Sequence, residues 1–362
     1  MIVISIIGTR PEIIKMAPLI PKFDATFEHV LVHTGQHYDY HMSEVFFKEL
    51  GLRRCDFDLN VGSYSPPKQI GLILIRLDEV IQKVNPQSII VLGDTNSSLA
   101  GTLAASKRKI PIIHIESGLR SFDKMMPEEI NRVVIDHMSE TLFAPSKLTV
   151  KNLSQEGICK NVFMVGNTVV DACLKSLPAA SESKVYERFG LGVDDYVVIT
   201  LHREANTEEK KLRNIVQALT RMPKFKFIFP IHPRTRKKLV QMNLWKKVRK
   251  TENVHITNPL SYLSFLCLLQ NSRFVLTDSG GIQEEAITVK VPCLTLRDNT
   301  ERWETIHLGA NKLIGTEPKR IVDETRIAWR DREWKQRIKR LKNPYGDGRS
   351  AERIVKRLEG LT

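Results

Sequence analysis

Three acidic positions in the first half of the chain have the clearest capacity for chemistry. Asp94 lies in Leu92-Gly-Asp-Thr95, Glu116 in His114-Ile-Glu-Ser-Gly118, and Glu128 in Met126-Pro-Glu-Glu-Ile-Asn-Arg132. Each comes at or just after the end of a predicted strand, so the three can converge on one cleft. Paired carboxylates take and return a proton, and burial beside like charges raises their proton affinity toward neutral pH. A simpler interpretation makes Glu128 an acid favoured by a helix N-terminus and Asp94 a helix cap.

Basic residues follow other predicted strands and are suited to binding an anion. Gly8-Thr-Arg-Pro-Glu12 comes directly after the first predicted strand, with Arg10 at the mouth of the sheet. His202 and Arg203 follow the first strand of the second half, where either can contact phosphate. The segment Ile231-His-Pro-Arg-Thr-Arg236 ends another strand and either lines the same cleft or turns the chain. The Gly8 segment is also compatible with an ordinary strand-to-helix turn.

The segment Thr277-Asp-Ser-Gly-Gly-Ile-Gln-Glu-Glu-Ala286 has the pattern of a strand, a turn and a helix. We expect Ser279 to cap the helix, and Gly280 and Gly281 to let backbone N–H groups approach a diphosphate closely. Two carboxylates in the following turn are acceptors of the kind that hold ribose hydroxyls. Two adjacent glycines are a weak signal alone, but together with the Gly8 segment they favour a nucleotide.

A run of three histidines suggests a metal site, which we consider unfavourable. His33, His37 and His41 recur every four residues, a spacing that would place them on one face of a helix. The segment begins as a predicted strand and contains Gly35, so the spacing is not expected to be helical. We therefore predict no bound metal.

Short β-branched runs alternate with segments of helical period along the whole chain. This alternation predicts parallel sheets covered by helices on both faces, with ligands at the carboxyl ends of the strands. The pattern restarts after a hinge near residues 165–169, so we expect one domain of residues 1–167 plus 346–362 and a second of residues 168–345. The predicted strands are 2–7, 28–34, 88–92, 110–115, 140–144 and 161–165, then 195–201, 225–231, 253–256, 273–277 and 291–296.

Composition is that of an ordinary soluble globular protein with an excess of positive charge. The 362 residues include 55 Lys and Arg against 41 Asp and Glu, a formal net charge of +14. Residues 234–250 hold eight Lys or Arg and no acid, but they lack aromatic platforms and any nucleic-acid-binding signature, so nucleic acid is not expected as a partner. No leader or membrane-spanning segment is expected, and we predict a cytoplasmic protein. The five cysteines are expected to be reduced core residues.

Seven motifs in a fixed order give the chain a family resemblance. Gly8-Thr-Arg-Pro-Glu12, Gly93-Asp-Thr95, Glu116-Ser-Gly-Leu-Arg120, Pro127-Glu-Glu-Ile-Asn-Arg132, His202-Arg-Glu204, the Thr277–Ala286 segment and Thr300-Glu-Arg302 resemble those of the non-hydrolysing UDP-N-acetylglucosamine 2-epimerases. The resemblance runs from Gly8 to the final helix. It departs from the family at Leu260, where some members carry a polar residue, and at Trp303, where proline is more usual.

The resemblance implies two Rossmann-like domains of the GT-B type with an active site in the cleft between them, and neither metal nor nicotinamide cofactor. The first domain would carry the acids around the sugar, and the second would hold most of the UDP. The implied catalytic residues are Asp94, Glu116, Glu128 and His202. The implied substrate-binding residues are Arg10, Lys15, Phe265, Ser279, Gly280, Gly281, Glu285 and Arg302. By this resemblance the diphosphate is bound by Arg10, His202, Ser279, Gly280 and Gly281. Glu285 would bind the ribose, Phe265 would lie on the uracil side, and Lys15 and Arg302 would complete the pocket.

The implied reaction is reversible inversion at C2 of UDP-N-acetylglucosamine through elimination of UDP to 2-acetamidoglucal and readdition. A modified UDP-sugar, such as a 2,3-diacetamido uronic acid, remains an alternative substrate. A GT-B glycosyltransferase, or a protein that binds without catalysis, is a rival interpretation, but neither accounts for three acids around the sugar. We expect a homodimer that serves polysaccharide biosynthesis. We do not predict activation by substrate at a second site, since the Gln36-His37 segment lacks the Arg that often follows there in the family.

Overall fold

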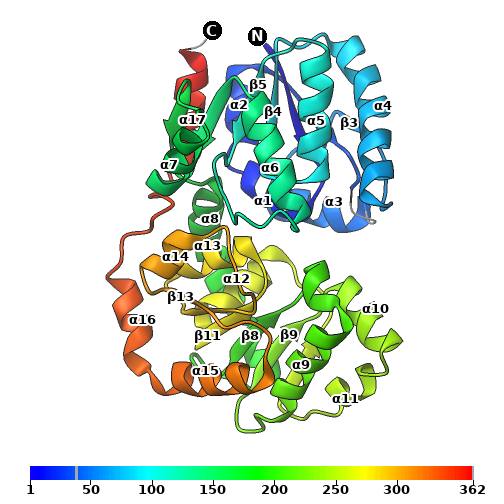
Figure 1. Cartoon of the computed structure of the whole chain (residues 1–362). Coiled ribbons are helices and arrows are strands. Elements are labelled where there is room, and N and C mark those ends of the chain that lie inside the picture. Colours follow the sequence, from blue (N-terminus) through cyan, green and yellow to red (C-terminus); the bar gives the residue numbers. More distant parts are fainter. Residues whose placement is uncertain (37–39, 361–362) are drawn as a thin grey trace. The chain divides into compact units, whose positions relative to one another are not determined.

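The computed structural model describes residues 1–36 and 40–360, and the chain divides into two compact units. Unit 1 comprises Met1–Ala172 and Pro344–Thr362, and unit 2 comprises Cys173–Asn343. Helix α8 (Thr168–Glu182) carries the chain from unit 1 into unit 2, and the chain returns to unit 1 after Asn343 (Figure 1). Each unit contains one parallel sheet with helices packed on it.

The sheet of unit 1 has seven strands in the order β3-β2-β1-β4-β5-β6-β7. Its central strands are buried on both faces, which explains why they are almost continuous apolar runs rather than alternating ones. The order places the end of β4 directly beside the end of β5, where Leu92 pairs with Ile115. The strands are β1 (Ile2–Ile7), β2 (Glu28–His33), β3 (Phe57–Asp58), β4 (Ser88–Leu92), β5 (Ile112–Ile115), β6 (Thr141–Ala144) and β7 (Val162–Met164).

Helices cover the sheet of unit 1. Helices α4, α5 and α6 lie side by side over one face and bury their apolar stripes against β1, β4 and β5 (Figure 1). Helix α17, near the C-terminus of the chain, packs beside α2. The helices of this unit other than α8 are α1 (Arg10–Met16), α2 (Ile20–Thr26), α3 (Tyr40–Glu49), α4 (Pro66–Val84), α5 (Asn96–Lys107), α6 (Pro127–Met138), α7 (Lys147–Gln155) and α17 (Ser350–Glu359).

Unit 2 has a six-stranded parallel sheet in the order β10-β9-β8-β11-β12-β13. One face is covered by α9, α10, α11 and α15, whose apolar residues form a continuous core with the strands. The strands are β8 (Val197–Thr200), β9 (Phe227–Pro230), β10 (Val254–Thr257), β11 (Phe274–Thr277), β12 (Cys293–Thr295) and β13 (Asn311–Leu313). The helices are η1 (Val185–Phe189), η2 (Glu204–Thr207), α9 (Glu209–Thr220), α10 (Pro233–Gln241), α11 (Trp245–Arg249), α12 (Tyr262–Asn271), α13 (Gly280–Thr288), α14 (Trp303–His307), α15 (Pro318–Arg330) and α16 (Arg332–Lys339).

The predicted fold class, two parallel sheets flanked by helices, is confirmed. Two short edge strands, β3 and β13, were not predicted, because neither Phe57-Asp58 nor Asn311-Lys-Leu313 is a β-branched apolar run. The prediction that all cysteines are core residues is wrong for Cys159, which is exposed, and Cys55 is only partly buried. All five cysteines are free.

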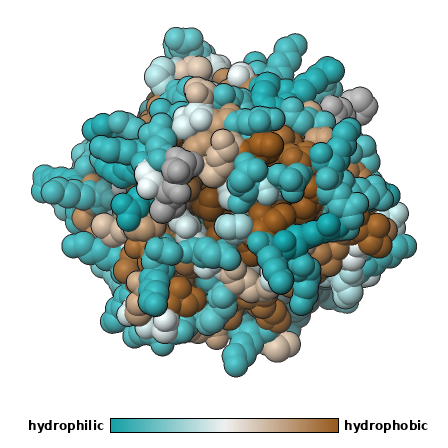
Figure 2. Space-filling view, turned by 90° about the horizontal axis from the view of Figure 1, so that it is seen from above, coloured by the Kyte–Doolittle hydropathy of each residue, from teal (hydrophilic) through white to brown (hydrophobic). Residues whose placement is uncertain are grey.

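Polar side chains dominate the part of the surface seen in Figure 2, where apolar residues gather near the middle of the view. The basic segment 234–250 belongs to α10 and α11, and its Lys and Arg side chains are exposed. Among residues 1–36 and 40–360, no helix is both long and apolar enough to cross a membrane.

The C-terminal segment is fastened to unit 1 at Gly166. The backbone N–H of Asn167 donates to the Tyr345 carbonyl at 2.8 Å, and the Ala351 N–H donates to Asp171 Oδ1 at 2.8 Å. Gly166 has φ of 94°, and a Cβ atom there would lie 2.5 Å from Ser350 Oγ and 2.8 Å from the Tyr345 carbonyl oxygen. Glycine is therefore required both by the backbone conformation and by the close approach of the returning chain.

Replacing this glycine should weaken the attachment. We expect Gly166→Ala to lose about 1–2 kcal/mol for the positive φ and roughly 1–3 kcal/mol more for the steric overlap. Gly157→Ala is the matched control, because Gly157 also has a positive φ, 81°, but a Cβ atom there would have no neighbouring atom within 4 Å. Urea unfolding of both variants measures the difference, and equal losses of stability would show that the close approach to Tyr345 contributes nothing.

Candidate active site

The acids of unit 1 gather where β4 and β5 end. Glu116 follows β5 directly and Asp94 comes two residues after β4, so the parallel register of the two strands brings both to one edge of the sheet. A methyl group on Gly93 would lie 3.9 Å from Glu116 Oε1, which places the Glu116 carboxylate beside the turn that holds Asp94. The turns that carry these two acids are therefore adjacent within unit 1.

Glu116 is a buried carboxylate with a cationic partner. Its Oε2 atom lies 2.5 Å from Lys15 Nζ and accepts a hydrogen bond from Asn167 Nδ2 at 3.1 Å. Both Lys15 and Glu116 are less than 9% exposed, so each supplies the opposite charge that the other needs when removed from water. Glu116 also has φ of 73°, an unusual conformation for a non-glycine residue and one that tends to occur at functional sites.

Asp94 is held by helix α6. Arg132 forms ion pairs with both Asp94 and Glu129, and Asn131 Nδ2 donates to the Asp94 carbonyl at 2.8 Å. Asp94 is not the cap of the following helix, because Thr95 takes that role by accepting a hydrogen bond from the Ser98 N–H. This finding removes the simpler interpretation of Asp94.

Glu128 and its neighbour Glu129 have different roles at the start of α6. Glu129 is buried and accepts hydrogen bonds from the backbone N–H groups of Ser121 and Phe122 at 2.9 and 2.8 Å, so it holds the loop after β5. Glu128 is half-buried in the first helical turn, and no hydrogen bond or ion pair joins its carboxylate to another described residue. Its position fits both the catalytic hypothesis and the simpler one of a favourable helix N-terminal acid.

Glu12, which the motif contained but to which sequence reasoning gave no role, organises the turn after β1. It accepts hydrogen bonds from the Gly8 N–H, Thr9 Oγ1, Thr95 Oγ1 and Ser98 Oγ at 2.9, 2.8, 2.7 and 3.1 Å. Burial raises the pKa of Glu12, although these four donors oppose the rise. The carboxyl group thus ties the Gly8 turn to the start of α5. Arg10, at the first position of α1, lies with its guanidinium 4.2 Å from the Phe46 ring centre.

The segment predicted to form an anion cradle in unit 2 is a turn between β11 and α13. Ser279 caps α13 by accepting a hydrogen bond from the Ile282 N–H at 3.4 Å. A Cβ on Gly280 would lie 2.2 Å from Glu301 Oε1, whereas one on Gly281 would meet only Ser279 Oγ at 4.0 Å. Gly280 is therefore needed for packing against Glu301, and Gly281 leaves space beside the backbone for an anion.

Asp278 orients His202 beside this cradle. It accepts hydrogen bonds from the N–H groups of His202 and Arg203, and its Oδ1 lies 3.1 Å from His202 Nδ1. Burial would raise the pKa of Asp278, but His202 and Arg203 outweigh it and the pKa is lowered. With Nδ1 directed at Asp278, the His202 Nε2 atom is available for a ligand, and the side chain is 41% exposed. Sequence reasoning did not assign Asp278, although the motif contains it.

The remaining predicted residues of unit 2 are buried. Arg302 Nε lies 2.8 Å from Glu284 Oε1, and Glu301 forms ion pairs with Arg203 and Arg297. Glu285, the predicted ribose ligand, follows Glu284 on α13 and is 7% exposed. Phe265, the predicted uracil contact, lies buried on α12 and is also 7% exposed.

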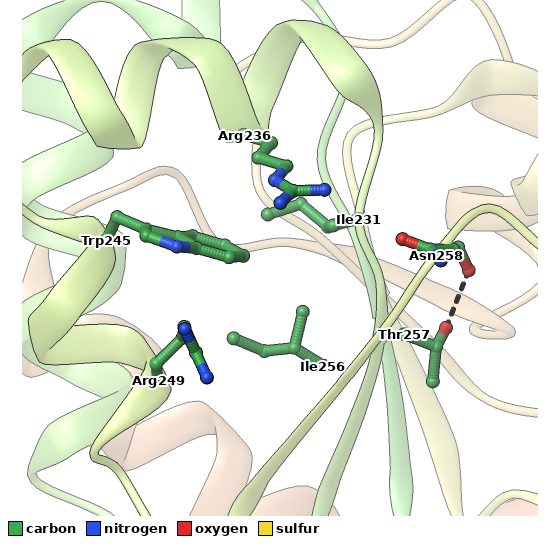
Figure 3. Close-up of a pocket in the computed structure, with 7 residues that line it drawn as sticks. All are labelled: Ile231, Arg236, Trp245, Arg249, Ile256, Thr257 and Asn258. Carbon is green, nitrogen blue, oxygen red and sulfur yellow. Dashed lines mark hydrogen bonds between the residues drawn. The ribbon is translucent and has the colours of Figure 1, made fainter.

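A separate pocket of about 230 Å³ lies beside the basic helices of unit 2. Figure 3 shows that Arg236, Trp245 and Arg249 reach it from α10 and α11, while the other lining residues come from the ends of β9 and β10. The Arg236 guanidinium lies 5.2 Å from the Trp245 ring centre. The pocket contains none of the site residues predicted from the sequence. Of the three histidines considered for a metal, His33 lies 3.6 Å from Asp58, and His37 lies outside the described residues.

Comparison with known proteins identifies relatives over the whole length of the chain. A family model described as UDP-N-acetylglucosamine 2-epimerase matches residues 22–359. The UDP-N-acetylglucosamine 2-epimerase of Methanocaldococcus jannaschii is 46% identical over 361 residues, which cover 97% of each chain. The UDP-2,3-diacetamido-2,3-dideoxy-D-glucuronate 2-epimerase of Pseudomonas aeruginosa is 38% identical over 369 residues, which cover 99% of each chain.

A solved structure is similar across both units. The structure of Methanocaldococcus jannaschii UDP-GlcNAc 2-epimerase in complex with UDP-GlcNAc and UDP matches with a TM-score of 0.93 at 45% identity, covering 99% of this chain and 100% of that one. Agreement of family model, sequence and structure extends far beyond the motifs that suggested it, and the chain therefore belongs to the UDP-N-acetylglucosamine 2-epimerase family.

Proposed function

We propose that this enzyme interconverts UDP-N-acetylglucosamine and UDP-N-acetylmannosamine by inverting C2 of the sugar, and that UDP is added back rather than lost to hydrolysis. The observation that carries the proposal is the buried Glu116–Lys15 pair beside the Asp94 turn, in a chain 46% identical to an enzyme named for this activity. A UDP-sugar carries a hexosamine and a nucleoside diphosphate, and so offers a ligand to the acids of unit 1 and to the cradle of unit 2.

The proposed reaction is an elimination followed by readdition. A carboxylate removes the weakly acidic C2 proton while the C1–O bond to UDP breaks, leaving 2-acetamidoglucal and UDP. The C1–O bond then forms again as a proton is delivered to the opposite face of C2. Glu116 takes part in the proton transfer, and Asp94 and Glu128 supply further acids around the sugar. The proposed reaction steps require no metal ion and no nicotinamide.

Groups in both units support departure of the diphosphate. Arg10 at the start of α1, His202 oriented by Asp278, and the N–H groups at the start of α13 are donors to the negative charge that develops on UDP. Glu285 accepts from the ribose hydroxyls in this proposal. UDP-N-acetylmannosamine is a glycosyl donor, so the product fits a role in polysaccharide biosynthesis.

A 2,3-diacetamido uronic acid is the second candidate substrate, favoured by the 38% identical relative named for it. Its extra carboxylate would need a cation near the sugar. The buried cations Lys15 and Arg132 in unit 1 are already paired, Lys15 with Glu116 and Arg132 with Asp94 and Glu129. This pairing and the higher identity to the first relative favour the N-acetylglucosamine nucleotide.

The elimination predicts exchange of the C2 hydrogen with solvent, because the proton passes through a protein carboxyl group. Incubated in heavy water with UDP-N-acetylglucosamine alone, the enzyme should form the manno epimer with deuterium at C2, which NMR detects. The diacetamido uronate nucleotide, tested separately, should react with a lower kcat/KM. A manno product that wholly retains its original C2 hydrogen would exclude the elimination, and no manno product would contradict the proposed activity itself.

Loss of Glu116 should affect proton transfer and leave nucleotide binding intact. We expect Glu116→Gln to lower kcat by at least ~100-fold, the usual contribution of an acid-base group, with unchanged affinity for UDP. Glu79→Gln is the control, because Glu79 is an exposed acid on α4. Rates near those of the parent enzyme for Glu116→Gln would remove Glu116 from the mechanism.

Loss of Glu285, unlike loss of Glu116, should weaken the binding of UDP. Glu285→Ala is expected to weaken UDP binding by roughly 1–3 kcal/mol through the loss of a charged acceptor for the ribose. Glu252→Ala, at an exposed residue before β10, is the matched control. Calorimetric titration with UDP measures both variants, and equal affinities would contradict the ribose assignment.

A further inference from the structure

Two buried residues outside the proposed machinery connect its two turns. His114 on β5 and Asp136 on α6 are 0% and 1% exposed. His114 Nδ1 lies 2.7 Å from Asp136 Oδ1, and His114 Nε2 lies 2.9 Å from the Gly93 carbonyl oxygen. The other carboxylate oxygen of Asp136 accepts from the Gly118 N–H at 3.0 Å and from Arg120 at 2.7 Å.

Both ring nitrogens of His114 face acceptors, one a carboxylate and the other a carbonyl. Hydrogen bonds at both nitrogens therefore fix the orientation of the ring. Within the same cluster, Arg120 forms ion pairs with both Asp136 and Glu156. Burial would raise the pKa of Asp136, but His114 and Arg120 outweigh burial and lower it.

The two ends of this chain of hydrogen bonds lie beside Asp94 and Glu116, and so can determine how these two residues are placed. The Gly93 carbonyl belongs to the peptide that joins Gly93 to Asp94, so holding it fixes the plane from which Asp94 projects. At the other end, Asp136 holds the N–H of Gly118, two residues beyond Glu116. The chain Gly93–His114–Asp136–Gly118 thus spans from the Asp94 turn to the Glu116 turn.

We propose that His114 and Asp136 are positioning residues, which clamp the Gly93-Asp94 turn to the Glu116–Gly118 turn and so hold Asp94 and Glu116 at the separation that C2 proton transfer requires. The proposal rests on the proposed function of those two acids. A displacement of about 1 Å in a catalytic group can cost about 100-fold in rate, so such a clamp affects turnover without touching substrate.

Two substitutions of His114 separate positioning from a purely structural role. In His114→Asn the amide nitrogen takes the place of Nδ1 and still donates to Asp136, but the Gly93 carbonyl loses its donor. In His114→Gln the amide nitrogen takes the place of Nε2 and still donates to Gly93, but Asp136 loses a donor. A buried carboxylate suffers more from a lost donor than a carbonyl does, so the Asn variant should be the more stable protein.

The clamp predicts that the more stable variant, His114→Asn, is the less active one. His114→Gln should keep kcat within about tenfold of the parent, whereas His114→Asn should lose about 100-fold, with UDP affinity equal in both. Thermal unfolding gives the stability order. The same pair of substitutions at His29 is the control, because His29 is also buried and bridges Asp24 and Ser5, but at the start of β2. There, both variants should keep parental kcat.

Hydrogen exchange of residues 93–99 provides a measurement that does not depend on activity. Exchange in this segment should be faster in His114→Asn than in His114→Gln. If the parent enzyme fails to epimerise, the proposed function is wrong, and this comparison still tests the clamp. Equal exchange in the two variants, or kcat that follows the stability order, would overturn it.

Asp136→Asn keeps the clamp testable if neither His114 variant folds. In this variant His114 Nδ1 can accept from the new amide while Nε2 still donates to the Gly93 carbonyl, so we expect kcat within about tenfold of the parent. A loss of about 100-fold in this variant would contradict the clamp.

Discussion

Charges removed from water must be matched by partners, and this constraint governs the loops at the carboxyl ends of both sheets. Glu116 is matched by Lys15, Glu12 by four donors, and Asp278 by His202 and two backbone N–H groups. Each of these acids has a partner from a segment that is distant in sequence, such as Lys15 and Glu116, which are 101 residues apart. The same contacts that make burial tolerable therefore also determine where the reactive groups stand.

Much of the fold follows from the sequence because parallel, fully buried strands are long apolar runs bounded by polar turns. The motifs also locate the turns that carry Asp94, Glu116 and the Gly280-Gly281 cradle, since each motif begins where an apolar run ends. The edge strands β3 and β13 were not predicted, because their pairing depends on neighbours in the sheet rather than on a pattern of their own.

The sequence does not show which polar residue of a motif is buried and which one faces the site. Glu128 and Glu129 are adjacent acids after the same proline, and only the helix rotation makes Glu129 the buried one that holds the Ser121 loop. The family resemblance implies that Lys15 completes the pocket, but its ion pair with Glu116 is visible only in the structure. Asp278, Glu12 and Asp136 were not singled out because a buried acid is indistinguishable from an exposed one until its donors are known.

The return of the chain to unit 1 has a consequence for how the protein is made. Residues 344–360 attach to Gly166, Asn167 and Asp171 only after the whole of unit 2 has been synthesised. Domains fold as units during synthesis, and the sequence of unit 2 is synthesised in full while unit 1 still lacks its last helix. Unit 1, which carries the acids and begins first, is thus completed after unit 2.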